Sequence, residues 1–170
     1  MGDQSDPKAI REALGDAVDA FNEAGHGIPT YEEHIDIEED WKVQLTKACR
    51  LLTAVESLAG DGFYTATIEL CFGATERSVE AYALAEGGDN LVDFHNHTHC
   101  YNRATELGLL SDTTTDKLRD LYDNNRTHSY YGGRRPTDRQ AQQMRQLARG
   151  VHEHVTNQIR EGGVCVCDLR

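Results

Sequence analysis

Residues 64–87 read YTATIELCFGATERSVEAYALAEG, and their apolar side chains recur at the spacing of one helix face. That face carries Ile68, Cys71, Phe72, Thr75, Val79, Tyr82 and Ala83. The pattern runs into AEGGDN, where Gly87 and Gly88 predict the end of the helix. No segment of the chain shows the sustained two-residue alternation that is typical of strands. The sequence therefore predicts an all-α fold.

Helical spacing also occurs on both sides of this segment. Before it, a stripe that ends at Gly60 and Gly62 consists of Trp41, Leu45, Ala48, Leu52 and Val55. After it we expect a helix over 91–107, a loop GLLSDTTTD at residues 108–116, and a helix with Leu118, Leu121, Tyr122 and Asn125 on its core face. Thr137 or Asp138 can cap a last helix with Met144, Leu147, Ala148, Val151, Val155 and Ile159. Long helices with short connections predict an antiparallel four- to five-helix bundle.

The predicted bundle occupies residues 38–161, between an N-terminal extension and a short tail. The extension, residues 1–37, contains an amphipathic helix between Pro7 and Gly25, followed by a linker with turn signals. The tail, residues 162–170, reads GGVCVCDLR and is expected to be a lone strand or disordered.

The composition is that of an acidic protein. The 170 residues carry a net charge of −12, and only four of the 17 basic residues are lysines. Acid excess, scarce lysine and the stretch SDTTTD suggest a halophile's cytosol, because a dense acidic surface keeps a protein soluble at high salt. The alternative is an ordinary acidic protein. The charge also argues against wholesale coating of nucleic acid, so any RNA contact has to be local.

A cytoplasmic protein without a membrane partner is expected. The chain has no apolar run of transmembrane length and no charged-then-apolar secretory leader. Its five cysteines, an odd number, are then reduced core or tail residues and not a disulfide framework.

The basic island in this acidic chain is LYDNNRTHSYYGGRRP, residues 121–136. Arg126, Arg134 and Arg135 can each grip phosphate oxygens, and His128 can take a proton from a ribose hydroxyl. Tyrosines such as Tyr130 and Tyr131 can stack on a base. The alternative is structural, because basic residues near a helix C-terminus also favour the helix dipole.

A second polar cluster, FHNHTHC, contains His95, His97, His99 and Cys100. On a helix, His95 and His99 share a face and can bind one transition metal. The alternative, which we favour, is a polar segment whose histidines cap or line a groove, so no metal or other cofactor is expected. His152 and His154, on the last helix, are placed at solvent positions.

The order of these motifs resembles that of the HEPN domains (higher eukaryotes and prokaryotes nucleotide-binding). YTATIELCFGATERSVEAYALAEG is similar to that family's long second helix. ELGLLSDTTTDKLRDLYDNNR is similar to its Leu-Leu turn and motif helix, and YYGGRRPTDRQAQQMRQLARGVHEHV to the loop and closing helix that follow. The similarity covers roughly residues 38–161.

This resemblance implies a homodimer in which two motif helices share one cleft, and a metal-independent ribonuclease of the toxin type beside a nucleotidyltransferase-like antitoxin. It places Arg126 at the arginine position of the family's motif and Thr127 at the polar position. Our hypothesis is that Arg126, His128 and Tyr130 are catalytic, and that Arg126, Thr127, Tyr131, Arg134 and Arg135 bind RNA or a nucleotide. Tyr130 stands four residues after Arg126, where the family usually has histidine. On a continuous helix Arg126 and His128 point about 200° apart, so they cooperate only if the helix ends at Thr127 or across a dimer.

Two functions follow as hypotheses. The first is a HEPN-like domain that binds RNA or a nucleotide and acts as a ribonuclease through Arg126. The second is a non-catalytic HEPN-like interaction module, in which the same patch docks a nucleotidyltransferase-like or other partner protein, since Tyr and Arg are favoured at interfaces.

Overall fold

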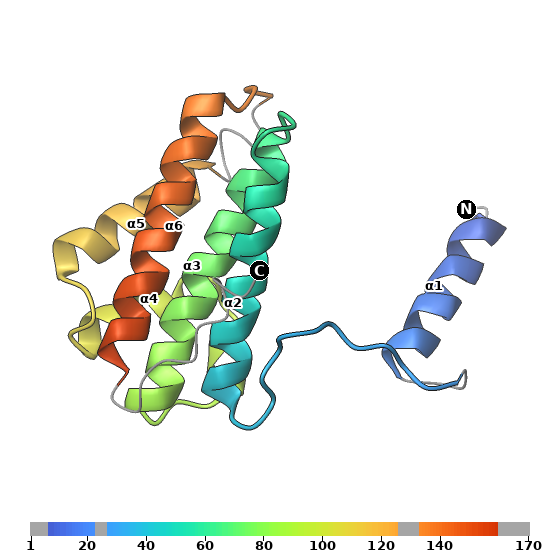
Figure 1. Cartoon of the computed structure of the whole chain (residues 1–170), viewed down its shortest axis with the longest axis horizontal. Coiled ribbons are helices and arrows are strands. Elements are labelled where there is room, and N and C mark those ends of the chain that lie inside the picture. Colours follow the sequence, from blue (N-terminus) through green and yellow to red (C-terminus); the bar gives the residue numbers. More distant parts are fainter. Residues whose placement is uncertain (1–6, 23–26, 126–132, 160–170) are drawn as a thin grey trace, which may run out of the picture. The chain divides into compact units, whose positions relative to one another are not determined.

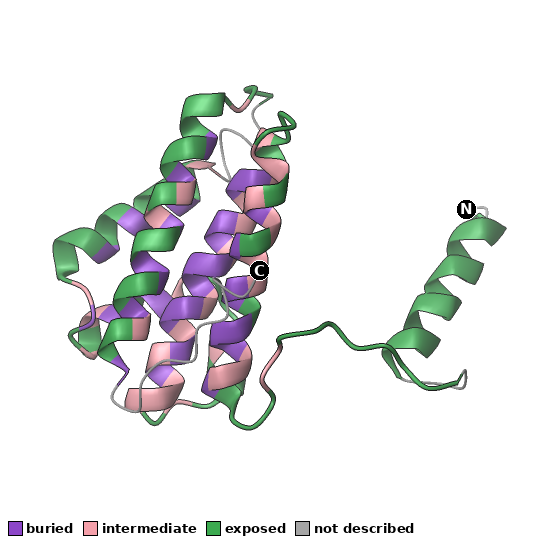
Figure 2. Cartoon of the chain, viewed as in Figure 1, coloured by how far each residue is buried: buried purple, intermediate pink, exposed green. Residues whose placement is uncertain are grey.

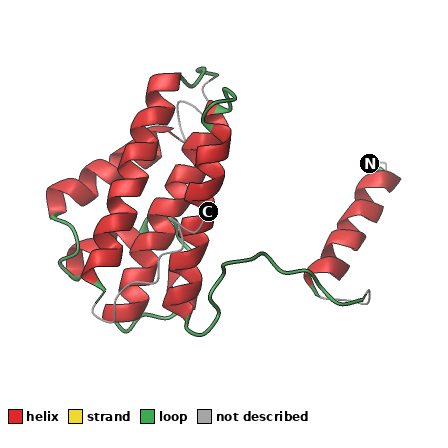
Figure 3. Ribbon diagram, viewed as in Figure 1, coloured by secondary structure: helices red, strands yellow, loops and turns green. Residues whose placement is uncertain are grey.

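The computed structural model describes residues 7–22, 27–125 and 133–159, and these residues form six α-helices and one short 3-10 helix (Figures 1 and 3). The helices are α1 (Lys8–Phe21), α2 (Asp40–Leu58), α3 (Tyr64–Glu86), η1 (Leu91–Phe94), α4 (His99–Glu106), α5 (Asp112–Asn124) and α6 (Asp138–Gln158). The described ranges contain no strand. The predicted all-α helical bundle is therefore confirmed.

The chain divides into two compact units, residues 1–33 and 34–170. In the first unit α1 has no buried residue, and its apolar stripe lies open to solvent (Figure 2). Leu14 is 62% exposed and Phe21 is 92% exposed. This helix therefore contributes no side chain to a core of its own.

The second unit is a bundle whose core lies between α2, α3 and α6 (Figure 2). Helix α3 is its central element and packs against α2, α6 and α4. Every predicted core residue of α2 is buried there: Trp41, Leu45, Ala48, Leu52 and Val55. Helices α2 and α3 are antiparallel, and the α4–α5 pair returns the chain so that α6 runs in the direction of α3 (Figure 1).

Glycine ends α3 for a steric reason. A Cβ atom added at Gly87 would lie 2.7 Å from the carbonyl oxygen of Ala83 and 2.7 Å from Cδ1 of Leu107. Both distances are shorter than real Cβ contacts allow, so no other residue fits this close approach without a shift of the chain. The predicted stop at Gly87 is confirmed, since α3 ends at Glu86.

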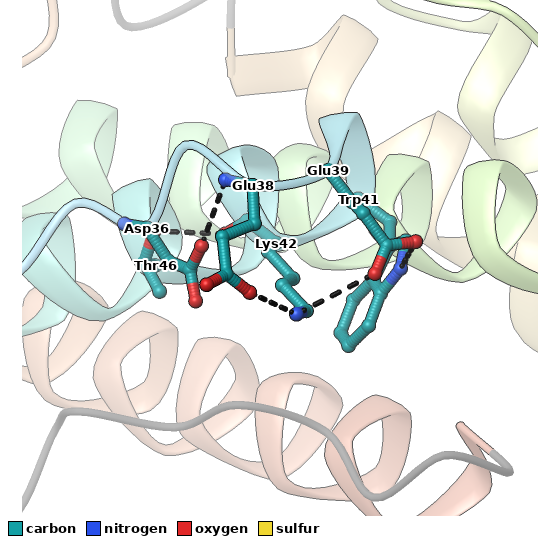
Figure 4. A network of polar contacts seen from close by, with 6 residues as sticks. All are labelled: Asp36, Glu38, Glu39, Trp41, Lys42 and Thr46. Carbon is teal, nitrogen blue, oxygen red and sulfur yellow. Dashed lines mark hydrogen bonds and ion pairs between the residues drawn. The ribbon is translucent and has the colours of Figure 1, made fainter.

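A polar network fixes the beginning of α2 (Figure 4). The backbone N–H of Asp36 donates to Thr46 Oγ1 at 3.0 Å, which ties the segment before the helix to its second turn. Lys42 Nζ lies 2.7 Å from Glu38 Oε2 and 5.6 Å from the ring centroid of Trp41. These contacts anchor the entry of the chain into the bundle, with Trp41 buried beneath them.

Two predicted boundaries are wrong. The expected continuous helix over 91–107 is interrupted at residues 95–98, because the side chain of Asn96 accepts hydrogen bonds from the Thr98 N–H at 2.9 Å and from its hydroxyl at 2.8 Å. Such a side-chain turn competes with helical bonding. The expected loop at 108–116 is shorter than predicted, because Ser111 accepts from the Thr114 N–H at 3.3 Å and starts α5 at Asp112.

No helix in the described ranges has the length and apolar character needed to cross a lipid bilayer. The predicted tail, 162–170, lies outside the described residues.

Candidate functional site

A cavity of about 490 Å³ opens between α3, the end of α5 and the beginning of α6. Its lining residues are Ile68, Phe72, Leu121, Asn124, Asn125, Arg134, Arg135, Thr137, Arg139, Gln140, Gln143, Met144 and Leu147. The volume lies in the range typical of small-molecule sites. The cavity therefore has room for a ligand of nucleotide size.

The floor and the rim of the cavity differ in chemistry. Phe72 and Met144 are buried members of the core, and Ile68 and Leu147 pack with them, so the floor is apolar. The rim consists of exposed or half-buried amide and guanidinium side chains: Asn124, Asn125, Gln140, Gln143, Arg134, Arg135 and Arg139. An apolar floor with a few polar groups around it is the usual form of a binding pocket.

A capping box at the start of α6 sets the position of the arginines. Thr137 Oγ1 accepts from the Gln140 N–H at 3.2 Å, and Gln140 Oε1 accepts from the Thr137 N–H at 2.8 Å. This confirms Thr137 as the cap and places Arg134 and Arg135 directly before the first turn of α6. Gly133 has a φ of 66°, the left-handed conformation that glycine adopts without strain.

The rim arginines are not neutralised by carboxylates of the described chain, in contrast to other arginines. Arg119 pairs with Asp116 at 3.1 Å, and Arg145 pairs with Glu56 at 2.5 Å. Within residues 7–22, 27–125 and 133–159, no carboxylate forms an ion pair with Arg134, Arg135 or Arg139. The positive charge of these three residues therefore remains available at the rim.

The structure brings together only part of the predicted site. Arg134 and Arg135 line the cavity, as does Asn125, the last described residue before the motif. Arg139 was not predicted as a site residue, although it lies only four residues after Arg135 in the chain. The remaining predicted site residues, namely Arg126, Thr127, His128, Tyr130 and Tyr131, lie outside the described residues.

The three histidines of FHNHTHC lie in different surroundings. His97 Nδ1 lies 2.8 Å from Glu76 Oε2, and the ring of His99 packs 5.4 Å from that of Phe94, while His95 is exposed. In the described part of the chain, no three His, Cys, Asp or Glu side chains are grouped so that they could hold a metal ion.

The prediction that His152 faces solvent is wrong. His152 is buried, with its Nδ1 2.9 Å from Ser78 Oγ on α3 and its Nε2 3.2 Å from Cys49 Sγ on α2. Ser78 donates its own hydroxyl proton to the Ala74 carbonyl, so its oxygen can accept from Nδ1–H of His152. One imidazole thus joins three helices. His154 is exposed, although its Nε2 lies 3.0 Å from the Leu109 carbonyl oxygen.

Two acidic side chains that were not predicted as functional lie one turn apart on α3. Glu76 is buried, and Glu80 follows one turn later. Burial raises the pKa of Glu80 to about 7, an effect that Arg77 opposes and the neighbouring Glu76 reinforces. Burial also raises the pKa of the Cys100 thiol, and the same two carboxylates add to this. The signal was the spacing of the two carboxylates on a helix with many apolar residues.

These observations define an all-α bundle protein with an arginine-rimmed cavity. The chain belongs to the family described as a domain of unknown function (DUF8154), which matches residues 5–167. No curated protein and no solved structure matches the chain.

Proposed function

We propose that the protein binds RNA or a nucleotide in the cavity between α3, α5 and α6. The observation that carries this proposal is the group of three rim arginines without carboxylate partners in the described residues, set in a chain with a net charge of −12. In such a protein the surface elsewhere repels a polyanion, so a local concentration of guanidinium groups favours one docking position.

The rim supplies phosphate contacts. A guanidinium presents several donors in a planar fork and can bind two phosphate oxygens at once. Arg134 and Arg135 stand before the N-terminus of α6, where the backbone N–H groups and the helix dipole add to the attraction for an anion. Arg139 lies on the first turn of the same helix, so all three cations act on one short stretch of ligand.

The apolar floor of the cavity and the amide side chains of its rim can bind a nucleotide base. Phe72, Met144 and Leu147 offer apolar surface that a flat base can cover. Asn124, Asn125 and Gln143 each provide a donor and an acceptor to the edge of such a base, and Gln140, whose Oε1 is bound to the Thr137 N–H, provides its amide donor. A ligand that carries both a base and a phosphate uses the whole cavity, whereas a simple anion uses the rim alone.

The HEPN resemblance supports the same location. It places the functional motif at the end of the helix that ends in Asn124, and both described flanks of that motif line the cavity. We therefore extend the proposal to metal-independent RNA cleavage in which Arg126 stabilises the phosphate and His128 or Tyr130 moves the proton. The sequence motif alone supports this step.

The binding test compares arginines inside and outside the cavity. A labelled single-stranded RNA of about ten nucleotides, within the usual site sizes, is titrated by fluorescence anisotropy at several salt concentrations. Arg139→Ala is expected to weaken binding about tenfold and to reduce the slope of log K against log salt by about 0.7 for one lost phosphate contact. Arg119→Ala removes the same charge from α5 outside the cavity lining and serves as the matched control.

The same samples separate binding from cleavage. RNA length is followed with chelator present, for the unmodified protein and for Arg126→Ala. Equal degradation by both proteins rejects the catalytic proposal and leaves the binding proposal intact. Equal affinity of Arg139→Ala, Arg119→Ala and the unmodified protein rejects the cavity as the RNA site and favours the interaction module.

A further inference from the structure

A cluster of ionisable side chains lies between α3 and the segment that leads into α4. Glu76 and Glu80 are one helical turn apart on α3, and His97 Nδ1 approaches Glu76 Oε2 at 2.8 Å. The Cys100 thiol donates to the His97 carbonyl at 3.3 Å, which ties the first turn of α4 to the same histidine. One contact therefore holds the loop of residues 95–98 against α3.

The surroundings of Glu80 contain little compensating charge. From α3 it faces Arg77 and Glu76, and from the loop it faces His97. From α4 it faces Cys100 and Tyr101, whose pKa values are both raised by burial and by Glu76 and Glu80, so both remain neutral near pH 7.

The two groups that lower the pKa of Glu80 have other partners. Arg77 donates to Gln44 at 2.6 Å, and His97 Nδ1 lies 2.8 Å from Glu76 Oε2. When Glu80 ionises, its charge therefore lies close to that of Glu76, in a space covered by neutral groups of α4. Such a charge favours entry of water and a looser contact between α4 and α3.

A chain of ring contacts leads from this cluster to the cavity floor. The imidazole of His97 lies 5.7 Å from the ring of Tyr122 on α5, and Tyr101 lies 6.5 Å from the same ring. Tyr122 meets Phe72 edge-on, with ring centroids 5.4 Å apart, and Phe72 lines the cavity. The neighbour of Tyr122 in the chain, Leu121, lines the cavity as well.

We propose that the Glu76–Glu80–His97 cluster makes ligand affinity of the cavity depend on pH, through the contacts of Tyr122 with Phe72. The neutral form of Glu80 keeps α4 and α5 packed on α3 and the cavity wall in place. The ionised form loosens that packing and lowers the affinity of the cavity for its ligand. This inference rests on the proposed function, since it concerns regulation of the same cavity.

The binding arm of the test uses a ligand whose own charge is constant. A short single-stranded RNA with a 5′-hydroxyl carries only phosphodiesters, which do not titrate between pH 6 and pH 8.5. At constant salt, the dissociation constant of the unmodified protein is expected to rise about fivefold or more from pH 6 to pH 8.5. In Glu80→Gln the rise is expected to disappear, and Glu69→Gln, on the same helix, is expected to retain it.

A second arm needs no ligand. Hydrogen exchange of the α4 and α5 amides is compared at both pH values, after correction for the intrinsic exchange rate. Protection in the unmodified protein is expected to be lower at pH 8.5 than at pH 6, and equal at both in Glu80→Gln.

The two arms distinguish failure of the site from failure of its regulation. If RNA binds with equal affinity at both pH values, the proposed regulation by pH is wrong, whereas the proposed binding function stands. RNA that binds at neither pH overturns the proposed function and the regulation with it. Unchanged α4 and α5 protection across the pH range overturns the conformational step, whatever the RNA does.

Discussion

Replacement of Glu80 by glutamine is expected to stabilise the protein, and only above the ordinary pKa of a glutamate. The pKa of Glu80 is raised from 4.5 to about 7 in the native state. Between these values the unfolded chain loses its Glu80 proton while the native protein keeps it. The free energy of unfolding therefore decreases as pH rises through this window, and the loss is complete above pH 7.

The size of the effect follows from the shift. Each pKa unit corresponds to about 1.4 kcal/mol, so the full shift sets an upper limit of about 3 kcal/mol. Glu80 is half-buried, and solvent screens part of this energy. We expect the free energy of unfolding of Glu80→Gln to exceed that of the unmodified protein by about 1–2 kcal/mol at pH 8. At pH 4.5 we expect the two free energies to differ little.

Urea unfolding followed by circular dichroism measures this difference, at one fixed salt concentration for all samples. The comparison of variants at each pH removes the contributions of all other titrating groups, because they are common to both proteins. Glu69→Gln, also on α3, controls for the loss of one negative charge. A Glu80→Gln variant that is less stable than the unmodified protein at pH 8, or equally stabilised at both pH values, would refute the reasoning.

Other variants test single elements of the fold by the same unfolding assay. Thr137→Ala removes the cap of α6 and is expected to cost about 1 kcal/mol; no loss would contradict the capping box. His152→Leu leaves buried Ser78 without its imidazole partner, and we expect a loss of about 1–3 kcal/mol, with an unchanged midpoint as the contradicting result. Leu45→Ala in the core is expected to cost about 2–5 kcal/mol, whereas exposed Leu14→Ala is expected to cost less than about 0.5 kcal/mol. Similar losses for both leucines would contradict the exposure of Leu14 on α1.

The helices were predictable because their signals are local. The stripe from Trp41 to Val55 repeats with the period of a helix, and all of its members are buried. Gly87 marked the end of α3 for the reason that the structure shows, since a side chain has no room there. The break at residues 95–98 was also local, because Asn96 bonds its own neighbours, but its turn chemistry was overlooked.

The buried polar groups were not predictable in the same way. His152 lies one position beyond Val151 on α6, and its polarity indicated solvent. Its burial is compensated by Ser78 and Cys49, which are 74 and 103 residues away in the chain. Glu76 is likewise compensated by His97 from another segment. Periodicity contains no information about which distant partner satisfies such a group, so only the packed structure shows it.

The acidic composition of the chain affects which contacts in the cavity can provide the affinity for RNA. If the acidic surface is an adaptation to high salt, phosphate contacts alone bind RNA weakly there, because salt removes the gain from counterion release. Burial of apolar surface is not screened in this way. Phe72, Met144 and Leu147 would then carry most of the affinity at high salt, and Arg134, Arg135 and Arg139 would mainly fix the position of the phosphate. It follows that the cost of Arg139→Ala should shrink as salt rises, whereas the cost of truncating the half-buried floor residue Leu147 to alanine should persist. The opposite order of salt dependence would show that the floor takes no part in binding.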